Sequence, residues 1–410
     1  MDQLDKIIKQ PNIQKIFNIF NKEQDGSIFL VGGCVRDALM GIEVTDFDFA
    51  ISYEPLKVIE ILKLNEIKYL DMGIKFGTVT AILNGSKYEI TTFRKDIVTD
   101  GRHAEVEFTK ELEIDASRRD FTVNSLYADK DGKIYDFFNG QEDLKNNQLK
   151  FIGDPKQRIK EDYLRIMRFF RFLTLYSNQT LDEKLIAIFK DESHNLSIIS
   201  KERIWSEFKE ILRSKNPVNT FQVMNKVSIF SNIIRNIEIS DGILNLIEIE
   251  EKIKMQNNYI LRLSLLLNND LKNIEDFLND FPLTVNEAKE LTELGKLNQK
   301  IVSYLSMKEV RSMLYRMGSD NFKNQIILNW AKDINNKNEV NWRSLYEVSN
   351  SWEKPDFSIK ADEVLRMGIE KGPLVSKILG ELEEWWIDND FINDKFSMIE
   401  RLKAICQAHK

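Results

Sequence analysis

A glycine pair directly after an apolar run constrains the fold of this chain more than any other feature. Residues 27–31 are predicted to form a buried strand that ends at Gly32 and Gly33, and a short helix is expected from about Val35. Glycine lets the backbone approach a phosphate group closely, and a helix that begins beside it would direct its positive end at the same anion. Arg36, near the start of that helix, adds a cation. The pattern predicts a phosphate-binding turn, with a plain surface turn as the alternative.

Two aspartates follow on the next predicted strand, residues 46–51. Asp46 and Asp48 are two residues apart, so their side chains should point to the same face of the sheet. A third carboxylate, Glu89, lies on another predicted strand. Carboxylate oxygens are the ligands that Mg²⁺ prefers, and a magnesium ion here could bind a triphosphate held by the glycine turn. The alternative is a set of solvated charges at strand ends, and both interpretations stay open at this point.

Arg118, Arg119 and Asp120 form a second charged cluster. Guanidinium groups bind phosphate oxygens, and a carboxylate can accept hydrogen bonds from ribose hydroxyls. The cluster could therefore bind the phosphates and the sugar of a nucleotide together. The alternative is that Asp120 caps a helix and that the two arginines are exposed.

A charged helix is predicted over residues 154–171. Asp162 and Arg165 would be i,i+3 neighbours on it, and they offer an acceptor beside a set of donors. Cytosine and adenine present an amine next to a ring nitrogen, whereas uracil and guanine present a carbonyl group there, so the pair would accept C and A. The alternative is a surface ion pair of about 0.2–0.5 kcal/mol. Arg168 and Arg171 follow Arg165 at three-residue steps. Because three residues fall short of one 3.6-residue turn, Arg171 would point away from Asp162 and toward phosphate, RNA or another helix.

The order of predicted elements gives the fold class. A chain of 410 residues is too long for one ordinary core, so two or more domains are expected. Residues 1–150 mix strands and helices, including a hairpin over residues 78–93 with a type I′ turn at Asn84-Gly85. After Asp154-Pro155 the apolar residues recur at helical spacing. The fold class is predicted to be α+β, with a mixed sheet and helices first and an all-α remainder after it.

Charge and targeting signals limit the partners and the compartment. The net charge of −7 is mild evidence against a nucleic-acid partner, although residues 150–172 are locally basic and would be the path of any RNA. No apolar run is long enough to span a membrane, and the first residues show no signal or transit pattern. Cys34 and Cys406 are the only cysteines of the sequence, so no disulfide framework is expected. These features predict a cytoplasmic location without membrane contact.

Taken in their order along the chain, these motifs resemble the class II tRNA nucleotidyltransferases, which are the bacterial-type CCA-adding enzymes, and their poly(A) polymerase relatives. The similarity covers about 180 residues, from Phe29 to about Leu212. The matching segments are Gly32-Gly33 with Arg36-Asp37 and Asp46-x-Asp48, Glu89 to Arg94, Asp100 to His103, Arg118 to Asp120, Glu161-Asp162-x-x-Arg165, and Lys201 to Glu207.

The resemblance implies a role for each group of residues. Asp46 and Asp48 would hold Mg²⁺, and Glu89 would be the third catalytic carboxylate. The nucleotide-binding residues would be Gly32, Gly33, Arg36, Arg119, Asp120, Asp162, Arg165, Arg168 and Arg171. Among them, Asp162 and Arg165 would serve as a protein template for CTP and then ATP.

Further segments are assigned by the same resemblance. The loop Asp100–His103 would re-aim the template, and the helix around Arg203–Phe208 would brace it. The implied fold is a nucleotidyltransferase head at residues 1–150, a helical neck at 151–215 and a body and tail at 216–410 that bind tRNA.

The implied activity is template-independent addition of CCA to the tRNA 3′ end from CTP and ATP, with no stable protein partner. Addition of A alone and poly(A) synthesis are same-fold alternatives, whereas CC-only addition is disfavoured because the Asp100–His103 loop has full length. A remote alternative is an inactive RNA-binding protein. An appended phosphohydrolase is disfavoured because it needs several histidine and aspartate ligands, and the three histidines here are scattered.

Overall fold

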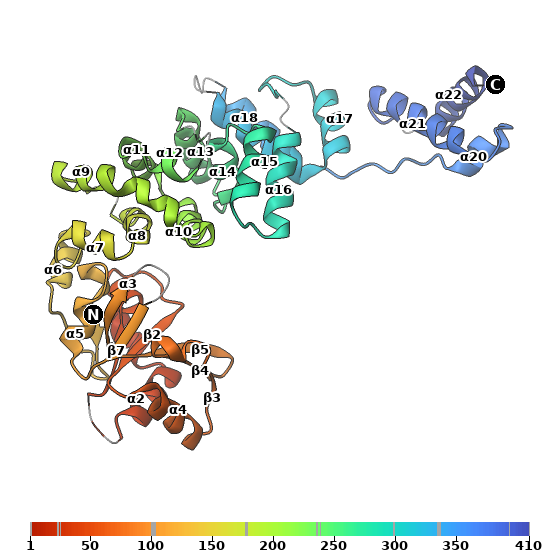
Figure 1. The fold of residues 1–410 in the computed structure, drawn as a ribbon. Helices are drawn as coiled ribbons and strands as arrows, with labels where there is room; N and C mark the ends of the chain where they lie inside the picture. The colour runs from red at the N-terminus through yellow and green to blue at the C-terminus, as the bar shows by residue number, and fades with distance from the viewer. Residues whose placement is uncertain are drawn as a thin grey trace. The chain divides into compact units, whose positions relative to one another are not determined.

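The computed structural model (Figure 1) divides into two compact units, which are described separately. The first comprises Met1–Arg235 with Asp280–Pro282, and the second comprises Asn236–Asn279 with Leu283–Lys410. The residues that the structure describes are 2–22, 24, 26–99, 104–176, 179–234, 237, 239–297, 300–333, 338–392 and 394–409.

A mixed seven-stranded sheet is the centre of the first unit. Its strand order is β3-β4-β5-β2-β1-β8-β9; β2 and β5 are parallel, and the other neighbours are antiparallel. The strands are β1 (Ile28–Val31), β2 (Phe47–Ile51), β3 (Lys68–Leu70), β4 (Thr78–Leu83), β5 (Ser86–Thr92), β8 (Tyr127–Ala128) and β9 (Ile134–Tyr135). A separate hairpin pairs β6 (Arg94–Thr99) with β7 (Ala104–Phe108). The predicted mixed sheet is confirmed.

The predicted hairpin turn is also confirmed. Asn84 and Gly85 connect β4 and β5, and both have positive φ angles, of 50° and 81°. Two consecutive positive φ values define a type I′ turn, whose twist matches that of the flanking strands. The predicted strand at residues 46–51 begins one residue later, at Phe47, so Asp46 directly precedes β2.

The two faces of the sheet carry different cores. Helices α1 to α4 cover one face, where α2 (Figure 1) begins with a proline at its first turn and buries Phe17 edge-on against Phe49, at 5.6 Å between ring centroids. The other face carries a smaller core that includes Ala50, Phe93 and Tyr127. Because Asp48 is two residues from Ala50 on β2, its side chain belongs to this less covered face.

The helices of the first unit follow the predicted change from mixed to helical structure. They are α1 (Asp2–Ile8), α2 (Pro11–Phe20), α3 (Gly33–Leu39), α4 (Pro55–Leu64), α5 (Leu112–Ser117), α6 (Gly140–Lys145), α7 (Pro155–Glu161), α8 (Leu164–Leu173), α9 (Glu183–Glu192), α10 (Lys201–Arg213), α11 (Val218–Lys226) and α12 (Ile229–Ile233). Short 3₁₀ turns occupy Ile74–Phe76, Thr122–Asn124 and Ser193–Ile198.

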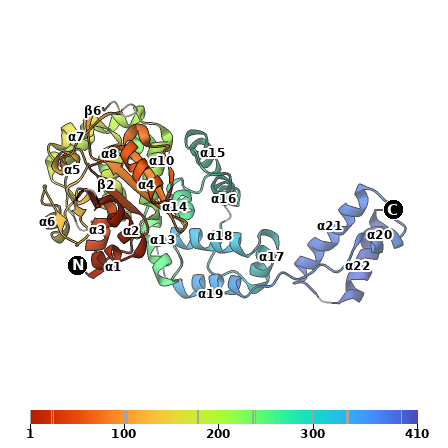
Figure 2. The same cartoon turned by 90° about the horizontal axis from the view of Figure 1, so that it is seen from below.

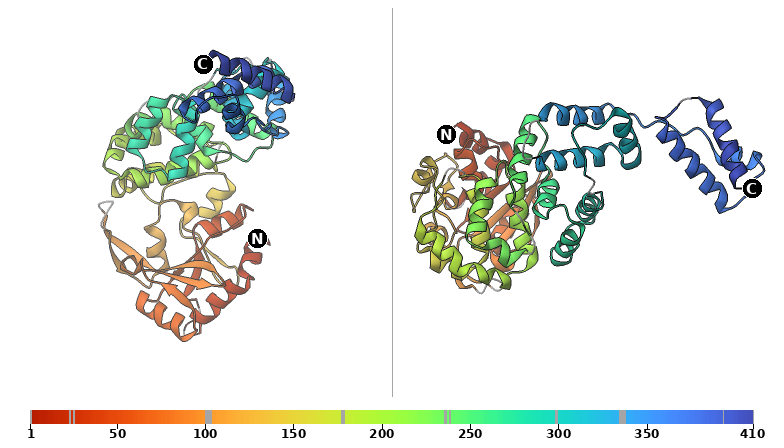
Figure 3. Two further views of the ribbon diagram at one scale, coloured as in Figure 1. Left: turned by 90° about the vertical axis from the view of Figure 1, so that its right-hand side faces the viewer. Right: turned by 90° about the horizontal axis from the view of Figure 1, so that it is seen from above.

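The second unit contains helices and loops in the part that the structure describes. Its helices are α13 (Asp241–Lys252), α14 (Tyr259–Leu266), α15 (Leu271–Asp280), α16 (Val285–Lys296), α17 (Met307–Met317), α18 (Ser319–Lys332), α19 (Glu339–Asn350), α20 (Ala361–Arg366), α21 (Pro373–Asp388) and α22 (Lys395–Ala408). Helices α18 and α19 lie side by side (Figure 2), and so do α21 and α22 (Figure 3).

Local signals explain several of these helices. Reciprocal capping boxes start α16 at Thr284 and α17 at Ser306.

The α+β fold class is confirmed, whereas the predicted boundaries at residues 150 and 215 stay predictions. None of the helices among the described residues is long and apolar enough to cross a membrane.

Candidate active site

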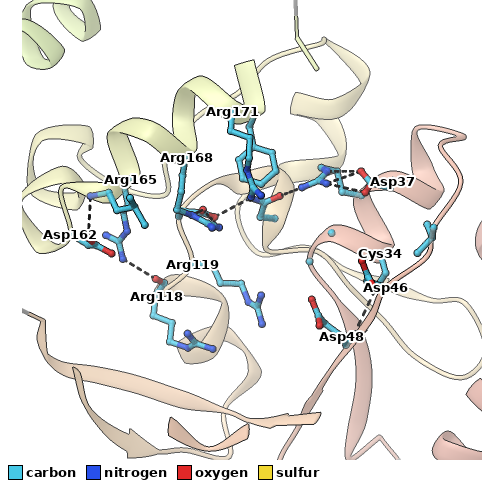
Figure 4. A pocket seen from close by; sticks show the side chains of 18 of the residues that line it. Cys34, Asp37, Asp46, Asp48, Arg118, Arg119, Asp162, Arg165, Arg168 and Arg171 are labelled. Atoms are coloured by element: carbon cyan, nitrogen blue, oxygen red, sulfur yellow. Dashed lines mark hydrogen bonds and ion pairs between the residues drawn. The ribbon is translucent and has the colours of Figure 1, made fainter. Parts of the chain in front are cut away.

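A cavity of about 730 Å³ opens on the less covered side of the first unit (Figure 4). Its lining comes from the turn after β1 and helix α3, from β2 and the segment before it, from β6, from the segment after α5, from Asp162 between α7 and α8, and from α8 and α10. Every predicted site residue except Glu89 lines it. Segments more than a hundred residues apart in the sequence therefore meet in one cavity.

The glycine turn forms one edge of the cavity. Gly32 has a φ of 73°, and a Cβ atom there would lie 3.4 Å from Nη1 of Arg119, so glycine suits both its backbone and its surroundings. Helix α3 begins at Gly33, two residues earlier than predicted, which makes Arg36 its fourth residue. The Arg36 side chain binds Asp37 and donates to Oδ1 of Asn124 at 2.5 Å. The turn thus exposes backbone to the cavity beside two guanidinium groups.

The aspartate pair lies at the same end of the cavity as the turn (Figure 4). The parallel register of β2 and β5 places Asp48 directly beside Glu89. The pKa of the Asp48 carboxyl is raised to about 6, first by desolvation from the surrounding protein and then by the negative charges of Glu89 and Asp46. Among the described residues, no three histidine, cysteine, aspartate or glutamate side chains form a closed metal cage. Asp46 and Asp48 face the cavity, and Glu89 lies next to them outside its lining.

A buried carboxylate, Asp115, holds the arginine pair in place. Its oxygens accept hydrogen bonds from Nε of Arg118 at 2.8 Å, from Nη2 of Arg119 at 3.2 Å and from the Tyr127 hydroxyl at 2.7 Å. Although burial alone would raise the pKa of Asp115, the charges of Arg119 and Arg118 hold it below its usual value. Both arginines are mostly buried, so the alternative of an exposed pair is wrong. Sequence reasoning missed the role of Asp115, although it lies within the same motif.

The Asp120 side chain is fixed by hydrogen bonds to Arg168, Phe121 and Asn124. Its Oδ2 accepts from Nε of Arg168 at 2.8 Å, and its Oδ1 accepts from the Phe121 backbone at 2.8 Å and from Nδ2 of Asn124 at 3.1 Å. Against the effect of burial, Arg168 and these donors lower the pKa of Asp120 to about 2. Asp120 does not cap a helix, because the following 3₁₀ turn has Phe121 at its N-cap position.

The prediction of one continuous helix over residues 154–171 is wrong. Helix α7 ends at Glu161, and Asp162 adopts an extended conformation with φ of −154° before α8 begins at Leu164. Its Oδ1 accepts from the Leu164 backbone N–H at 3.1 Å, and its main-chain carbonyl accepts from the N–H of Arg165 at 3.0 Å. Aspartate is a preferred residue at a helix start because it accepts hydrogen bonds from the first free N–H groups. This competing local interaction breaks the helix.

The break changes the partners of the predicted base-reading pair. Asp162 is bound by Nη2 of Arg203 on α10 at 2.7 Å, whereas Arg165 binds Glu161 at 2.5 Å and the carbonyl of Arg158 at 2.8 Å. Both side chains still line the same cavity. The expected brace from the helix around Arg203–Phe208 thus has a direct contact with Asp162.

Phe172, a second residue missed by sequence reasoning, makes cation–π contacts with three arginines. The guanidinium groups of Arg36, Arg168 and Arg171 lie 4.7, 5.7 and 4.4 Å from the centre of its ring. Glu207 on α10 pairs with Arg168 at 3.5 Å and with Arg171 at 2.9 Å. Arg171 therefore contacts another helix, as predicted, and still lines the cavity. Phe172 gave no signal because it continues the apolar pattern of α8.

The predicted re-aiming loop, Asp100–His103, lies outside the described residues. The hairpin from which it extends, β6 and β7, begins with Arg94, which lines the cavity.

Comparison with protein families and curated proteins gives matches over nearly the whole chain. The Poly A polymerase head domain matches residues 28–150, and the probable RNA and SrmB-binding site of polymerase A matches residues 179–239. The chain is 31% identical to the human CCA tRNA nucleotidyltransferase 1, mitochondrial, over 97% of this chain and 92% of that protein. It is 27% identical to the CCA-adding enzyme of Staphylococcus haemolyticus over 96% of each.

Solved structures share the fold. The Bacillus stearothermophilus CCA-adding enzyme in complex with CTP aligns with a TM-score of 0.74 and 24% identity over 98% of both chains. The Thermotoga maritima CCA-adding enzyme complexed with tRNA aligns with a TM-score of 0.70 and 21% identity, also over 98% of both. At these identities the likeness concerns the fold.

Proposed function

Because the chain belongs to the CCA tRNA nucleotidyltransferase family, we propose that it adds C, C and A in turn to the 3′ end of tRNA, with CTP and ATP as substrates. One observation carries the proposal beyond family membership: carboxylates suited to a metal and polar side chains suited to a base line a single cavity. The terminal 3′-hydroxyl attacks the α-phosphate of the bound nucleotide, and pyrophosphate leaves.

Asp46 and Asp48 would hold Mg²⁺. Magnesium is usually bound by one or two carboxylates together with water and substrate phosphates, which fits an open aspartate pair better than a closed cage. Desolvation and then the negative charges of Glu89 and Asp46 raise the pKa of Asp48, and a bound cation would relieve the repulsion between these carboxylates. When bound, the ion would act as a Lewis acid that makes the attacking hydroxyl more acidic and stabilises the negative charge of the leaving pyrophosphate. Glu89, beside Asp48 in the sheet, would add to the negative charge that attracts it.

The remaining site residues would bind the nucleotide. Gly32, Gly33, Arg36 and Arg119 border the aspartates and would bind the triphosphate. Asp120, whose carboxylate is kept ionised, would accept hydrogen bonds from the ribose. The cluster that Arg168 and Arg171 form around Phe172 would complete this pocket.

Asp162 and Arg165 would select the base. A carboxylate offers about four acceptor positions, and Asp162 uses two of them, for Leu164 and Arg203, so it can still accept an amine proton. Arg165 has five N–H groups and can donate to the ring nitrogen of C or A. Uracil and guanine would instead turn a carbonyl oxygen toward the Asp162 carboxylate, and unpaired polar groups of this kind discriminate strongly.

Poly(A) synthesis is the second candidate, favoured by the match of residues 28–150 to a poly(A) polymerase head. Three tRNAs would separate the candidates: one lacking CCA, one ending in C and one ending in CC, each incubated with CTP and ATP singly and together. When CTP and ATP are both present, CCA addition predicts that each product ends at CCA; A-only addition extends the CC substrate alone, and poly(A) synthesis gives long A tails. An inactive RNA-binding protein would release no pyrophosphate.

A cytoplasmic location stays a prediction, since the human and mouse relatives are named as mitochondrial.

A further inference from the structure

Nucleotide addition brings two phosphate-bearing partners into one cavity. The incoming nucleotide carries its triphosphate, and the RNA end carries the last internucleotide phosphate together with the attacking 3′-hydroxyl. The function proposed above uses the arginines near the glycine turn and around Phe172 for the nucleotide. Arg94 and Arg118 line the same cavity and have no part in that assignment.

We propose that Arg94 and Arg118 form a second anion subsite, which binds the last internucleotide phosphate of the RNA acceptor. The inference rests on the proposed nucleotide addition and adds to it a place for the attacking strand. The ligand class is a phosphodiester, which carries one negative charge and presents two oxygens to a pair of guanidinium groups.

A single buried carboxylate oxygen holds the two residues together. Oδ1 of Asp115 accepts from the backbone N–H of Arg94 at 3.1 Å and from Nε of Arg118 at 2.8 Å. Asp115 is 1% exposed, so this anchor is shielded from solvent. Arg94 is the first residue of β6 and Arg118 directly follows α5, so the anchor joins two elements at one edge of the cavity.

The guanidinium group of Arg94 is largely buried and incompletely hydrogen-bonded. Its Nη1 donates to the carbonyl of Phe76, and its carboxylate partner Asp96 lies 3.8 Å from Nε. Among the described residues, no atom accepts a hydrogen bond from this buried Nε. Burial first, and then the charge of Arg118, lower the pKa of Arg94 to about 10. A bound anion would supply the missing compensation.

The position of the pair suits the attacking strand. Arg119, next to Arg118, lies against Gly32, and its charge partly offsets the rise in the pKa of Asp48, so it marks the place of the reacting phosphate. Figure 4 shows Arg118 and Arg171 on opposite sides of the cavity. The subsite therefore lies across the cavity from the cluster at Phe172 and leaves the triphosphate with its own ligands.

A double-mutant cycle tests the proposal by removing one charge from the protein, one from the RNA, or both. The acceptor is a tRNA ending in CC whose last internucleotide linkage is either a phosphate or a neutral methylphosphonate. The proteins are the full chain, Arg94→Gln, Arg94→Lys and Arg118→Gln, with Lys57→Gln on α4, outside the cavity, as the matched loss of one charge. The readouts are the KM values for RNA and for ATP, and RNA binding by fluorescence anisotropy without nucleotide.

The cycle has distinct expected results. In the wild-type protein, the methylphosphonate should weaken RNA binding by about tenfold, and Arg94→Gln should do the same with normal RNA. The methylphosphonate and Arg94→Gln combined should weaken RNA binding no more than either change alone. The slope of the logarithm of the RNA-binding constant against the logarithm of the salt concentration should become smaller by about 0.7 for the one lost contact. The KM for ATP should stay within about twofold of the wild-type value. Arg94→Lys should restore sensitivity to the methylphosphonate, and Lys57→Gln should behave as the wild type.

Two results would overturn the subsite. One is a methylphosphonate effect in Arg94→Gln and Arg118→Gln as large as in the wild type, and the other is a rise in the KM for ATP in place of that for RNA. If Arg94→Gln does not fold, Arg118→Gln decides by the same cycle. A wild-type protein that binds the tRNA but adds no nucleotide refutes the proposed function, while the anisotropy cycle still decides the subsite. A wild-type protein that does not bind the tRNA refutes both.

Discussion

Replacing Asp48 by asparagine should make the protein more stable at neutral pH while it abolishes nucleotide addition. The pKa of Asp48 is raised from 3.8 to about 6, so between these values the folded state binds more protons than the unfolded state. The stability that this proton binding gives is complete below pH 3.8 and is lost as the pH rises through 6. Above pH 6 the charged carboxylate therefore opposes folding, and a neutral asparagine removes that opposition.

The shift sets the size of the effect. A displacement from 3.8 to about 6 corresponds to at most about 3 kcal/mol at neutral pH. The Asp48 side chain is exposed to solvent in the cavity, and screening of exposed charges reduces the expected gain to about 1 kcal/mol. For a unit of this size, that gain corresponds to a rise of about 2–4 °C in the melting temperature.

Thermal unfolding in EDTA measures the gain without metal. At pH 7.5, Asp48→Asn should melt about 2–4 °C above the wild type, and the difference should fall to roughly half at pH 5. Glu43→Gln is the matched control, because Glu43 is an exposed carboxylate that also lines the cavity. It should change the melting temperature by less than about 1 °C.

Addition of Mg²⁺ then separates the charge argument from the metal assignment. Mg²⁺ with CTP should raise the melting temperature of the wild type and of Glu43→Gln, and it should leave Asp48→Asn unchanged, because ligand binding stabilises only a protein that binds the ligand. An Asp48→Asn protein that melts at or below the wild-type temperature in EDTA at pH 7.5 would refute the argument from the raised pKa of Asp48. Near-normal incorporation of CMP by that variant would refute the metal assignment.

Three further predictions concern other walls of the cavity. Arg165→Ala should lower the preference for C and A over U and G by about tenfold or more, measured as kcat/KM with each of the four nucleotides, and unchanged selectivity would exclude the template role. Glu207→Gln should release Arg168 and Arg171 and raise the KM for CTP and ATP by about tenfold with little change in melting temperature; an unchanged KM would show that Glu207 does not orient the two arginines for the nucleotide. The stability that Asp120 contributes is complete above pH 3.8 and is lost as the pH falls toward 2, so Asp120→Asn should flatten the acid side of the stability profile, which denaturation between pH 2 and 5 measures.

The sequence predicts best where one short segment determines the geometry. The Asn84-Gly85 turn follows from the need for two positive φ angles. Asp46 and Asp48 both line the cavity, as the two-residue period of a strand predicts, although Asp46 lies one residue before β2. The neighbouring position of Glu89 is harder, since the parallel pairing of β2 and β5 is a long-range property. There the family resemblance supplied what local pattern could not.

The contacts that position the site residues could not be predicted from the sequence either, because they too are long-range properties of the fold. Asp115 reads as one acid in a charged segment, and its function emerges only when Tyr127, Arg118 and Arg119 surround it in the fold. A buried carboxylate with three donors is costly unless all of them are present, which the sequence does not display.

The break at Asp162 shows how a local preference can override a regular pattern. Helical periodicity continues through residues 154–171, but an aspartate can satisfy the N–H groups at the start of a new helix, and here it does so. The consequence is that Asp162 and Arg165 are held by different elements, Asp162 by Arg203 on α10 and Arg165 by Glu161 on α7. A pair on one continuous helix would have its side chains oriented by that helix, whereas here a different element orients each of the two side chains. The proposed reading of the base by these two side chains therefore depends on contacts to both α7 and α10.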